Sequence, residues 1–189
     1  MELVPIASVD ASAMRWLRTA ESPIAFELSS GDRPVARLTW SRASGSLATL
    51  ATAGGASTLK RVGYLHPILT ARDVGATTDR ARVSLHLNYH RIELRGGATY
   101  RFHRAGLLLP AWTVSTEAGT ELVHVEPVRE GRKLAGGAVI VAPAGVGNPE
   151  LPLLLGLAWY VIVLAWFEDE ALVPLEGDDR GGSAGPAGR

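Results

Sequence analysis

The sequence predicts a mainly β protein, a barrel or a sandwich, whose strands are followed by one hydrophobic C-terminal α-helix. Short segments that alternate apolar and polar residues recur along the chain, and glycine-rich turns separate them, as is typical of barrels and sandwiches. They are followed by residues 151–167, a run of 17 residues without a charge that is apolar on every face of a helix. The length of 189 residues indicates one domain with a substantial core.

The strands are predicted from this alternation. Ile24, Phe26 and Leu28 alternate with other residues in the first strand, and residues 35–40 form the second after a turn at Gly31. Further strands are predicted at 47–51, 58–65, 68–72, 82–87, 91–95, 99–103, 112–115, 121–125 and 137–141.

The chain divides into three parts. Residues 1–20 are interpreted as a lead-in, and residues 21–173 as the barrel domain with its central helix at 151–168. Residues 174–189 are acidic, rich in glycine and almost free of large apolar side chains, so this tail is predicted to be disordered.

One hairpin, at residues 91–103, allows a prediction of register. A three-residue loop at 96–98 pairs Ile92 with Phe102 and Leu94 with Tyr100, which keeps the apolar side chains on one face. The outward-facing pairs of this register are Glu93 with Arg101 and Arg91 with His103.

The helix at 151–167 must be buried either in protein or in a bilayer. At 1.5 Å per residue its 17 residues span about 25 Å, which is less than the roughly 30 Å of a hydrocarbon core. Its flanks are acidic and carry no Lys or Arg that would anchor it at a membrane interface. Length and flanks favour a helix buried in protein, where Gly156 would allow a strand to approach closely. A single transmembrane span, with the β-domain on the cytoplasmic side, is the alternative.

Composition and motifs exclude several classes of function. The chain has no Cys, so thiol catalysis and thiolate-ligated metals are excluded, and its net charge of zero argues against nucleic acid as a partner. His86 and His90 would lie about 13 Å apart on one strand, too far to share a metal ion. A glycine turn at 145–147 imitates a dinucleotide-binding loop, but Glu150 stands where the third glycine is needed. No catalytic motif is present, so we expect neither an enzyme nor a cofactor. The N-terminus lacks the apolar core of a secretory signal, which favours a cytoplasmic protein.

The whole pattern resembles the tubby C-terminal-like superfamily, which includes the LURP-one-related proteins and the phospholipid scramblases. The similarity covers roughly residues 22–170. It rests on FELSSGDRPVARLTW, TLKRVGYLHPILTARDVG, IELRGGATYRF, AWTVSTEAGTELVHV and the final LPLLLGLAWYVIVLAW. The resemblance implies a mainly β, non-enzymatic protein: a closed antiparallel β-barrel surrounding a hydrophobic C-terminal α-helix that fills its lumen. Tubby proteins bind phosphoinositides through basic residues, so it also implies a binding module for anionic lipid headgroups or another polyanion, peripheral to a membrane.

The basic residues that would carry such binding concentrate in one segment. Residues 60–104 contain nine Lys or Arg and only three Asp or Glu, whereas residues 150–189 contain two basic and seven acidic side chains. We therefore predict a weak anion-binding surface for anionic phospholipid in this segment. Its predicted residues are Lys60, Arg61, Arg91, Arg95, Arg101 and His103. Protein partners are not predicted.

Overall fold

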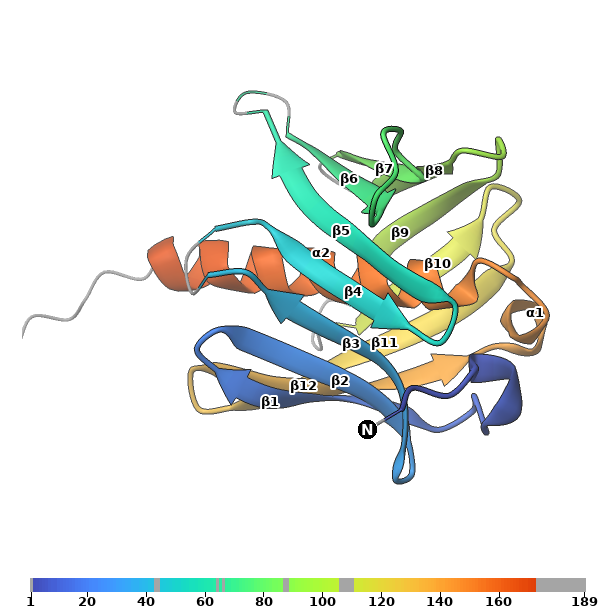
Figure 1. The fold of residues 1–189 in the computed structure, drawn as a ribbon, viewed down its shortest axis with the longest axis horizontal. Helices are drawn as coiled ribbons and strands as arrows, with labels where there is room; N and C mark the ends of the chain where they lie inside the picture. The colour runs from blue at the N-terminus through green and yellow to red at the C-terminus, as the bar shows by residue number, and fades with distance from the viewer. Residues whose placement is uncertain are drawn as a thin grey trace, which may run out of the picture.

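Twelve antiparallel strands close into one barrel in the part of the chain that the structure describes (Figure 1). This computed structural model describes residues 2–42, 45–63, 65, 67–86, 89–105 and 111–172, with side chains up to Phe167. Each strand pairs with its neighbours in sequence, and β1 pairs with β12 to close the barrel. The strands are β1 Met14–Glu21, β2 Ile24–Ser30, β3 Arg33–Trp40, β4 Ala48–Thr52, β5 Gly55–Val62, β6 Ile68–Asp73, β7 Ala81–Leu85, β8 His90–Leu94, β9 Thr99–Ala105, β10 Ala111–Thr116, β11 Glu121–Glu130 and β12 Lys133–Val141. A 3₁₀-turn at Ile6–Ser8 precedes the barrel, and the helices α1 Pro143–Val146 and α2 Leu151–Leu172 follow it.

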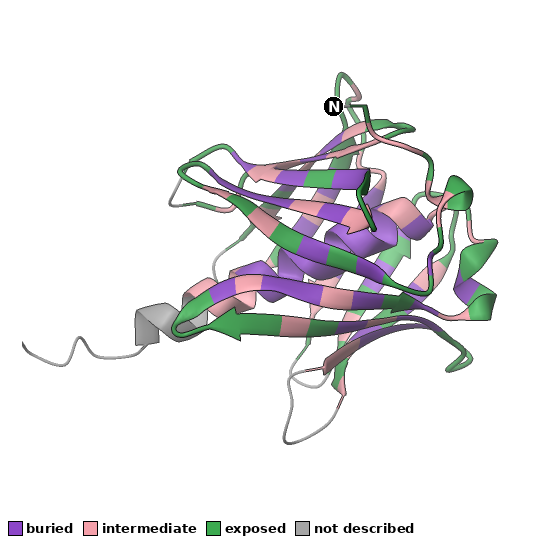
Figure 2. Cartoon of the chain, turned by 90° about the horizontal axis from the view of Figure 1, so that it is seen from below, coloured by how far each residue is buried: buried purple, intermediate pink, exposed green. Residues whose placement is uncertain are grey.

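Helix α2 fills the lumen of the barrel, as the sequence predicts. Its residues from Leu151 to Val163 are buried, apart from the half-buried Pro152, and Figure 2 shows buried residues on the helix and along the strands around it. Trp159 of α2 stacks on Trp16 of β1, with 5.6 Å between the ring centroids. A closed barrel of this size leaves space that strand side chains alone do not fill, and an apolar helix fills it.

The membrane alternative for residues 151–167 gains no support. Among the described residues, no helix is long and apolar enough to cross a bilayer. The apolar faces of α2 contact the strands instead, and Gly156 provides the expected close approach. A Cβ at this position would collide with the side chain of Leu50 in β4.

The first strand was not predicted, because its residues fell in the lead-in at 1–20. Met14 and Trp16 are buried and Arg15 is exposed, which fits a strand with one inner face. The pattern then breaks, since Leu17 points outward at 46 % exposure and the half-buried Arg18 takes the next inward position. Because of these two residues the sequence of β1 does not alternate regularly between apolar and polar side chains, so the strand that closes the barrel was not predicted.

The hairpin of β8 and β9 has the predicted faces and loop length but a different register. Ile92 pairs with Tyr100 and Glu93 with Thr99, so the three-residue loop is 95–97 rather than 96–98. Gly97 has a φ of +86°, which the last residue of such a loop requires and which Ala98 would adopt only with strain. The turn chemistry therefore shifts the pairing, and Arg91 lies opposite Arg101 instead of His103.

The interpretation of His86 and His90 as members of one strand was wrong. Strand β7 ends at Leu85, which pairs with His90 across a hairpin, and the amide of His86 donates to the carbonyl of Tyr89 at 3.1 Å. The two histidines thus lie close together across a turn. The predicted tail at 174–189 lies outside the described residues.

The topology gives the barrel two distinct ends. Because successive strands are antiparallel, the β1–β2, β3–β4, β5–β6 and β11–β12 turns lie at the end where α2 leaves the lumen, here named the C-mouth (Figure 1). The β2–β3, β4–β5, β6–β7 and β8–β9 turns lie at the end where α2 begins, here named the N-mouth.

Candidate functional site

The predicted anion-binding residues do not form one surface. Arg91 and Arg101 lie side by side on the outer face of β8 and β9, as expected. Carboxylates accompany them, however. Arg91 is 3.4 Å from Glu93 and 3.5 Å from Glu117, and Arg101 is 3.3 Å from Glu117. These ion pairs offset the positive charge that an anion would need.

The other predicted residues lie elsewhere. His103 lines a shallow outer groove with Arg101 and Tyr89. Arg95 lies in the β8–β9 turn at the N-mouth, close enough to Asp73 to help lower the pKa of that carboxyl. The alternation of β5 separates the last two, since Lys60 is exposed and Arg61 lies near the hydroxyl of Tyr160 inside the barrel.

A second basic cluster, missed in the sequence, lies at the C-mouth. A hollow of about 280 Å³ is lined there by three cationic side chains, Arg18, Arg132 and Lys133, and by Trp166 and Phe167 of α2. Its other lining residues are Phe26, Leu134 and Val163. The structure joins β1 to the β11–β12 turn and the end of α2, both of which lie more than 100 residues after β1 in sequence, so no local motif could show this hollow.

The electrostatics of the hollow favour an anion. Glu21 lies 2.9 Å from Arg18 and 3.4 Å from Lys133, while Arg132 forms no ion pair with any described residue. The Nε of Arg18 is buried and has no hydrogen-bond partner among the described residues. A buried donor without a partner costs free energy. The donor that an anionic oxygen in the hollow can reach is the exposed guanidinium of Arg132, which forms no ion pair with a described carboxylate.

The surrounding C-mouth surface carries the same sign of charge. Six cationic side chains lie on or beside its turns, against the carboxylates of Glu21 and Glu130. The cations are Arg18, Arg42, Lys60, Arg129, Arg132 and Lys133. Glu168, Asp169 and Glu170 follow in the sequence, and with them the count is six basic residues against five acidic ones. Arg129 also lies over the ring of Trp166, 4.1 Å from its centroid.

Exposed apolar side chains occur beside these cations. In the β5–β6 turn Leu65 is 83 % exposed, and Val62 and Ile68, which pair at the base of the turn, are 50 % and 39 % exposed. Leu47 of the neighbouring β3–β4 turn is 44 % exposed. The sequence interpretation extended the strand to residue 65, whereas β5 ends at Val62, so Leu65 projects from the turn.

Helix α2 fixes these turns in place. The hydroxyl of Tyr160 donates a hydrogen bond to the carbonyl of Ser46, and burial raises the pKa of this phenol, so it stays a donor. The amide of Arg61 in turn donates to the hydroxyl of Ser46 at 3.3 Å. The β3–β4 turn is thus joined both to the helix and to the strand that leads into the β5–β6 turn.

The arrangement is suited to binding. Among the residues that the structure describes, no group of three or more His, Cys, Asp or Glu could hold a metal ion. What the C-mouth offers is a fixed set of cationic donors around an aromatic floor, with apolar turns projecting beside them.

Comparisons of the chain with protein-family models, with curated proteins and with solved structures found no match. The resemblance to the tubby C-terminal-like superfamily therefore stays a prediction.

Proposed function

We propose that the protein is a non-enzymatic binding module that docks its C-mouth on membrane surfaces containing anionic phospholipid. The observation that carries this proposal is the hollow lined by Arg18, Arg132 and Lys133, of which Arg132 forms no ion pair with any described residue. A lipid phosphate supplies several strong acceptor oxygens for such donors. The headgroup occupies the hollow, and the aromatic rings of Trp166 and Phe167 lie at the interface.

The apolar turns add the second contribution to docking. Full burial of a leucine side chain is worth about 1.5–3 kcal/mol, and Leu65 is almost fully exposed before docking. Each cation near an anionic surface adds about 1 kcal/mol at low salt. Three cations and Leu65 together supply about 5 kcal/mol, which gives reversible and salt-sensitive binding.

The outer-face arginines predicted from the sequence fit this function less well. Arg91 and Arg101 share Glu117, and Glu93 adds a further carboxylate, so an approaching phosphate meets a nearly neutral surface. No exposed large apolar side chain other than Tyr89 accompanies them on the described part of β8 and β9.

Vesicle co-sedimentation tests the proposal and separates the two surfaces. The wild-type protein is mixed with phosphatidylcholine vesicles, with and without phosphatidylserine, at low and at physiological salt. We expect binding only to the phosphatidylserine vesicles, decreasing as salt increases. Replacing Arg132 and Lys133 with serine should abolish it, while the matched double variant Arg91→Ser/Arg101→Ser should bind like the wild type.

Two matched single variants test the apolar contribution to docking. Leu65→Ser removes an exposed apolar side chain at the C-mouth, and Val74→Ser removes one that is 65 % exposed in the β6–β7 turn at the N-mouth. Only Leu65→Ser should weaken binding. Equal loss in both variants, or loss in Arg91→Ser/Arg101→Ser alone, would contradict docking through the C-mouth.

A further inference from the structure

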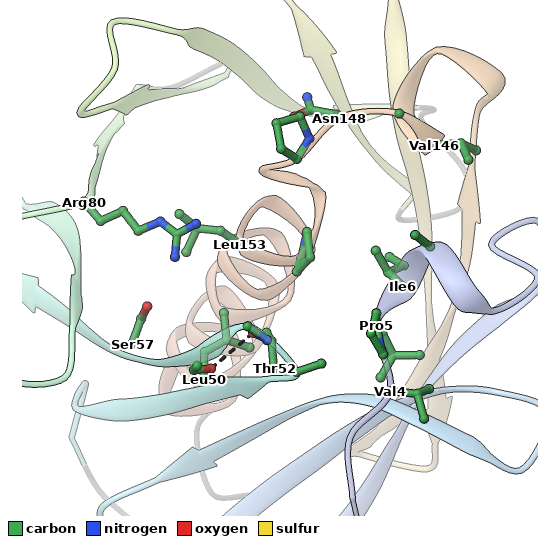
Figure 3. A pocket seen from close by; sticks show the side chains of 18 residues that line it. Val4, Pro5, Ile6, Leu50, Thr52, Ser57, Arg80, Val146, Asn148 and Leu153 are labelled. Carbon is green, nitrogen blue, oxygen red and sulfur yellow. Dashed lines mark hydrogen bonds between the residues drawn. The ribbon is translucent and has the colours of Figure 1, made fainter.

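The N-mouth contains a cavity of about 510 Å³ that is separate from the C-mouth hollow (Figure 3). It lies between the N-terminal segment, the β4–β5 turn and the first turn of α2. The N-terminal segment is held there by two contacts: the amide of Val4 donates to the carbonyl of Pro34 at 2.9 Å, and Arg33 donates to the carbonyl of Ser8 at 2.6 Å. A volume of this size is in the range of small-molecule sites.

Most of the cavity wall is apolar. Figure 3 shows Val4, Pro5 and Ile6 on one side, and Leu153 of α2 near the opposite wall. The other apolar lining residues are Ala7, Val35, Leu50, Ala53, Val146, Pro149 and Pro152. Such a wall accepts a short hydrocarbon chain, because contact with the wall removes apolar surface from water.

One charged side chain, Arg80, reaches the cavity from the wall opposite the N-terminal segment (Figure 3). Its guanidinium donates to Glu150 at 2.8 Å and to Asp73 at 3.3 Å. The hydroxyl of Ser57 donates to Asp73 at 2.7 Å, and this bond, followed by Arg80, lowers the pKa of the Asp73 carboxyl. The carboxyl of Asp73 therefore stays ionised, and its hydrogen bond and that of Glu150 hold the guanidinium in place.

The charges around Arg80 determine which kind of polar group a ligand can place beside it. A guanidinium has five N–H donors, and the two carboxylates use two of them, so donors stay available for a further acceptor. The positive charge of Arg80 is already compensated by Asp73 and Glu150, so an anionic group would gain little and would be repelled by the carboxylates. An uncharged oxygen acceptor, such as a hydroxyl, ester or amide, is not repelled by the carboxylates, and it can accept a hydrogen bond from Arg80 without needing a net positive charge there.

We propose that the N-mouth cavity binds a small amphipathic molecule that has a short apolar chain and an uncharged, oxygen-bearing polar head. The chain packs between the N-terminal segment and α2, and the head accepts a hydrogen bond from Arg80. This site is independent of the proposed membrane function, because it uses other residues at the opposite end of the barrel.

Amide NMR shifts of the ¹⁵N-labelled protein test the site with three probes of equal chain length, 1-octanol, octanoate and octylammonium. We expect 1-octanol to shift the amides of Gly54, Gly147 and Asn148 with saturation, because all three residues line the cavity. Octylammonium has no acceptor for Arg80 and should bind about tenfold more weakly, which is the effect of one hydrogen bond to a charged donor. Octanoate should also bind more weakly than 1-octanol, because the carboxylates of Asp73 and Glu150 repel it.

Two variants and one control locate the binding. Gly147 has an ordinary φ of −86°, and a Cβ there would meet no heavy atom within 4 Å, so Gly147→Leu reduces the cavity without backbone strain and should abolish binding. Arg80→Gln should weaken 1-octanol about tenfold, and octanoate should still bind more weakly than 1-octanol because the carboxylates of Asp73 and Glu150 are retained. Arg82→Gln, which leaves the cavity wall unchanged, should bind as the wild type does.

Several results would overturn the proposal. These are shifts that do not saturate, tighter binding of octanoate than of 1-octanol, and unchanged binding by Gly147→Leu. The C-mouth variant Arg132→Ser/Lys133→Ser should bind 1-octanol normally, so failure at one mouth is distinguishable from failure at the other.

Discussion

Gly137 of β12 faces the indole ring of Trp159, and this contact predicts the cost of adding one methyl group inside the barrel. In Gly137→Ala the new Cβ would lie 2.7 Å and 3.0 Å from Cζ3 and Cη2 of Trp159, and 2.9 Å from the carbonyl oxygen of Glu126. The ring has little room to move, because Trp159 is fully buried and lies between Trp16 and Phe26, with centroid distances of 5.6 Å and 5.4 Å.

The expected loss of stability is the difference between two effects. Overpacking of a filled core costs about 1–3 kcal/mol. Alanine recovers about 0.5–1 kcal/mol relative to glycine within a strand. The free energy of unfolding should therefore decrease by up to about 2.5 kcal/mol. In a Trp159→Phe background, where the two crowded ring atoms are gone, the same substitution should cost about 1 kcal/mol less.

Urea unfolding of the four proteins of this double-mutant cycle measures both quantities. Gly147→Ala serves as the control, since its Cβ meets no heavy atom within 4 Å and its φ is −86°. It should be neutral or stabilise by up to about 1 kcal/mol. Strict additivity of Gly137→Ala and Trp159→Phe, or stabilisation by Gly137→Ala, would refute the placement of the helix against β12.

Three further predictions follow from buried and charged groups. Leu155→Asp or Val161→Asp should abolish cooperative urea unfolding, because each places an unpaired charge inside the barrel, and a wild-type transition would contradict the lumenal helix. Burial, with a smaller effect of the charge on His86, lowers the pKa of His90 to about 4. Since its unfolded value is about 6.5, the unfolded chain binds more protons between these values, and stability decreases as pH falls from about 6.5 to about 4. Urea midpoints measured between these pH values should decrease less with falling pH in His90→Phe than in the wild type. The same dependence on pH in both proteins would contradict the buried, neutral state of His90. Converting the acids at 168–170 to amides should strengthen vesicle co-sedimentation, whereas weaker binding would argue against an anionic partner at the C-mouth.

The fold was predictable from the sequence because the inward positions of most strands follow one simple rule. The rule is that every second residue of a strand is apolar and faces inward. Leu38 and Trp40 illustrate it, because they lie two residues apart in β3 and both are fully buried. Strand β1 escaped prediction because Leu17 and Arg18 reverse that rule. The β8–β9 register escaped because hydrophobic matching alone does not show that the positive φ falls on Gly97.

The candidate site was less predictable, since it depends on pairing between distant segments. The charge count in residues 60–104 pointed to Arg91 and Arg101, which are exposed, but it could not show that Glu117 pairs with both of them. The C-mouth hollow needs β1 beside β12, and only the closed barrel places Arg18 near Lys133. Clustering of like charges in the sequence therefore predicts an anion-binding site less well than does the end of the barrel at which each charged side chain lies.

Single-site fluorescent labelling tests docking through the C-mouth most directly. The chain contains no cysteine, so Leu65→Cys and Val74→Cys each provide one attachment site for an environment-sensitive nitrobenzoxadiazole probe. With phosphatidylserine vesicles at low salt, docking through the C-mouth predicts a blue shift and increased emission from the probe at residue 65, and no change from the probe at residue 74. A response at residue 74 with none at residue 65, or no response at either position while the protein co-sediments, would contradict it.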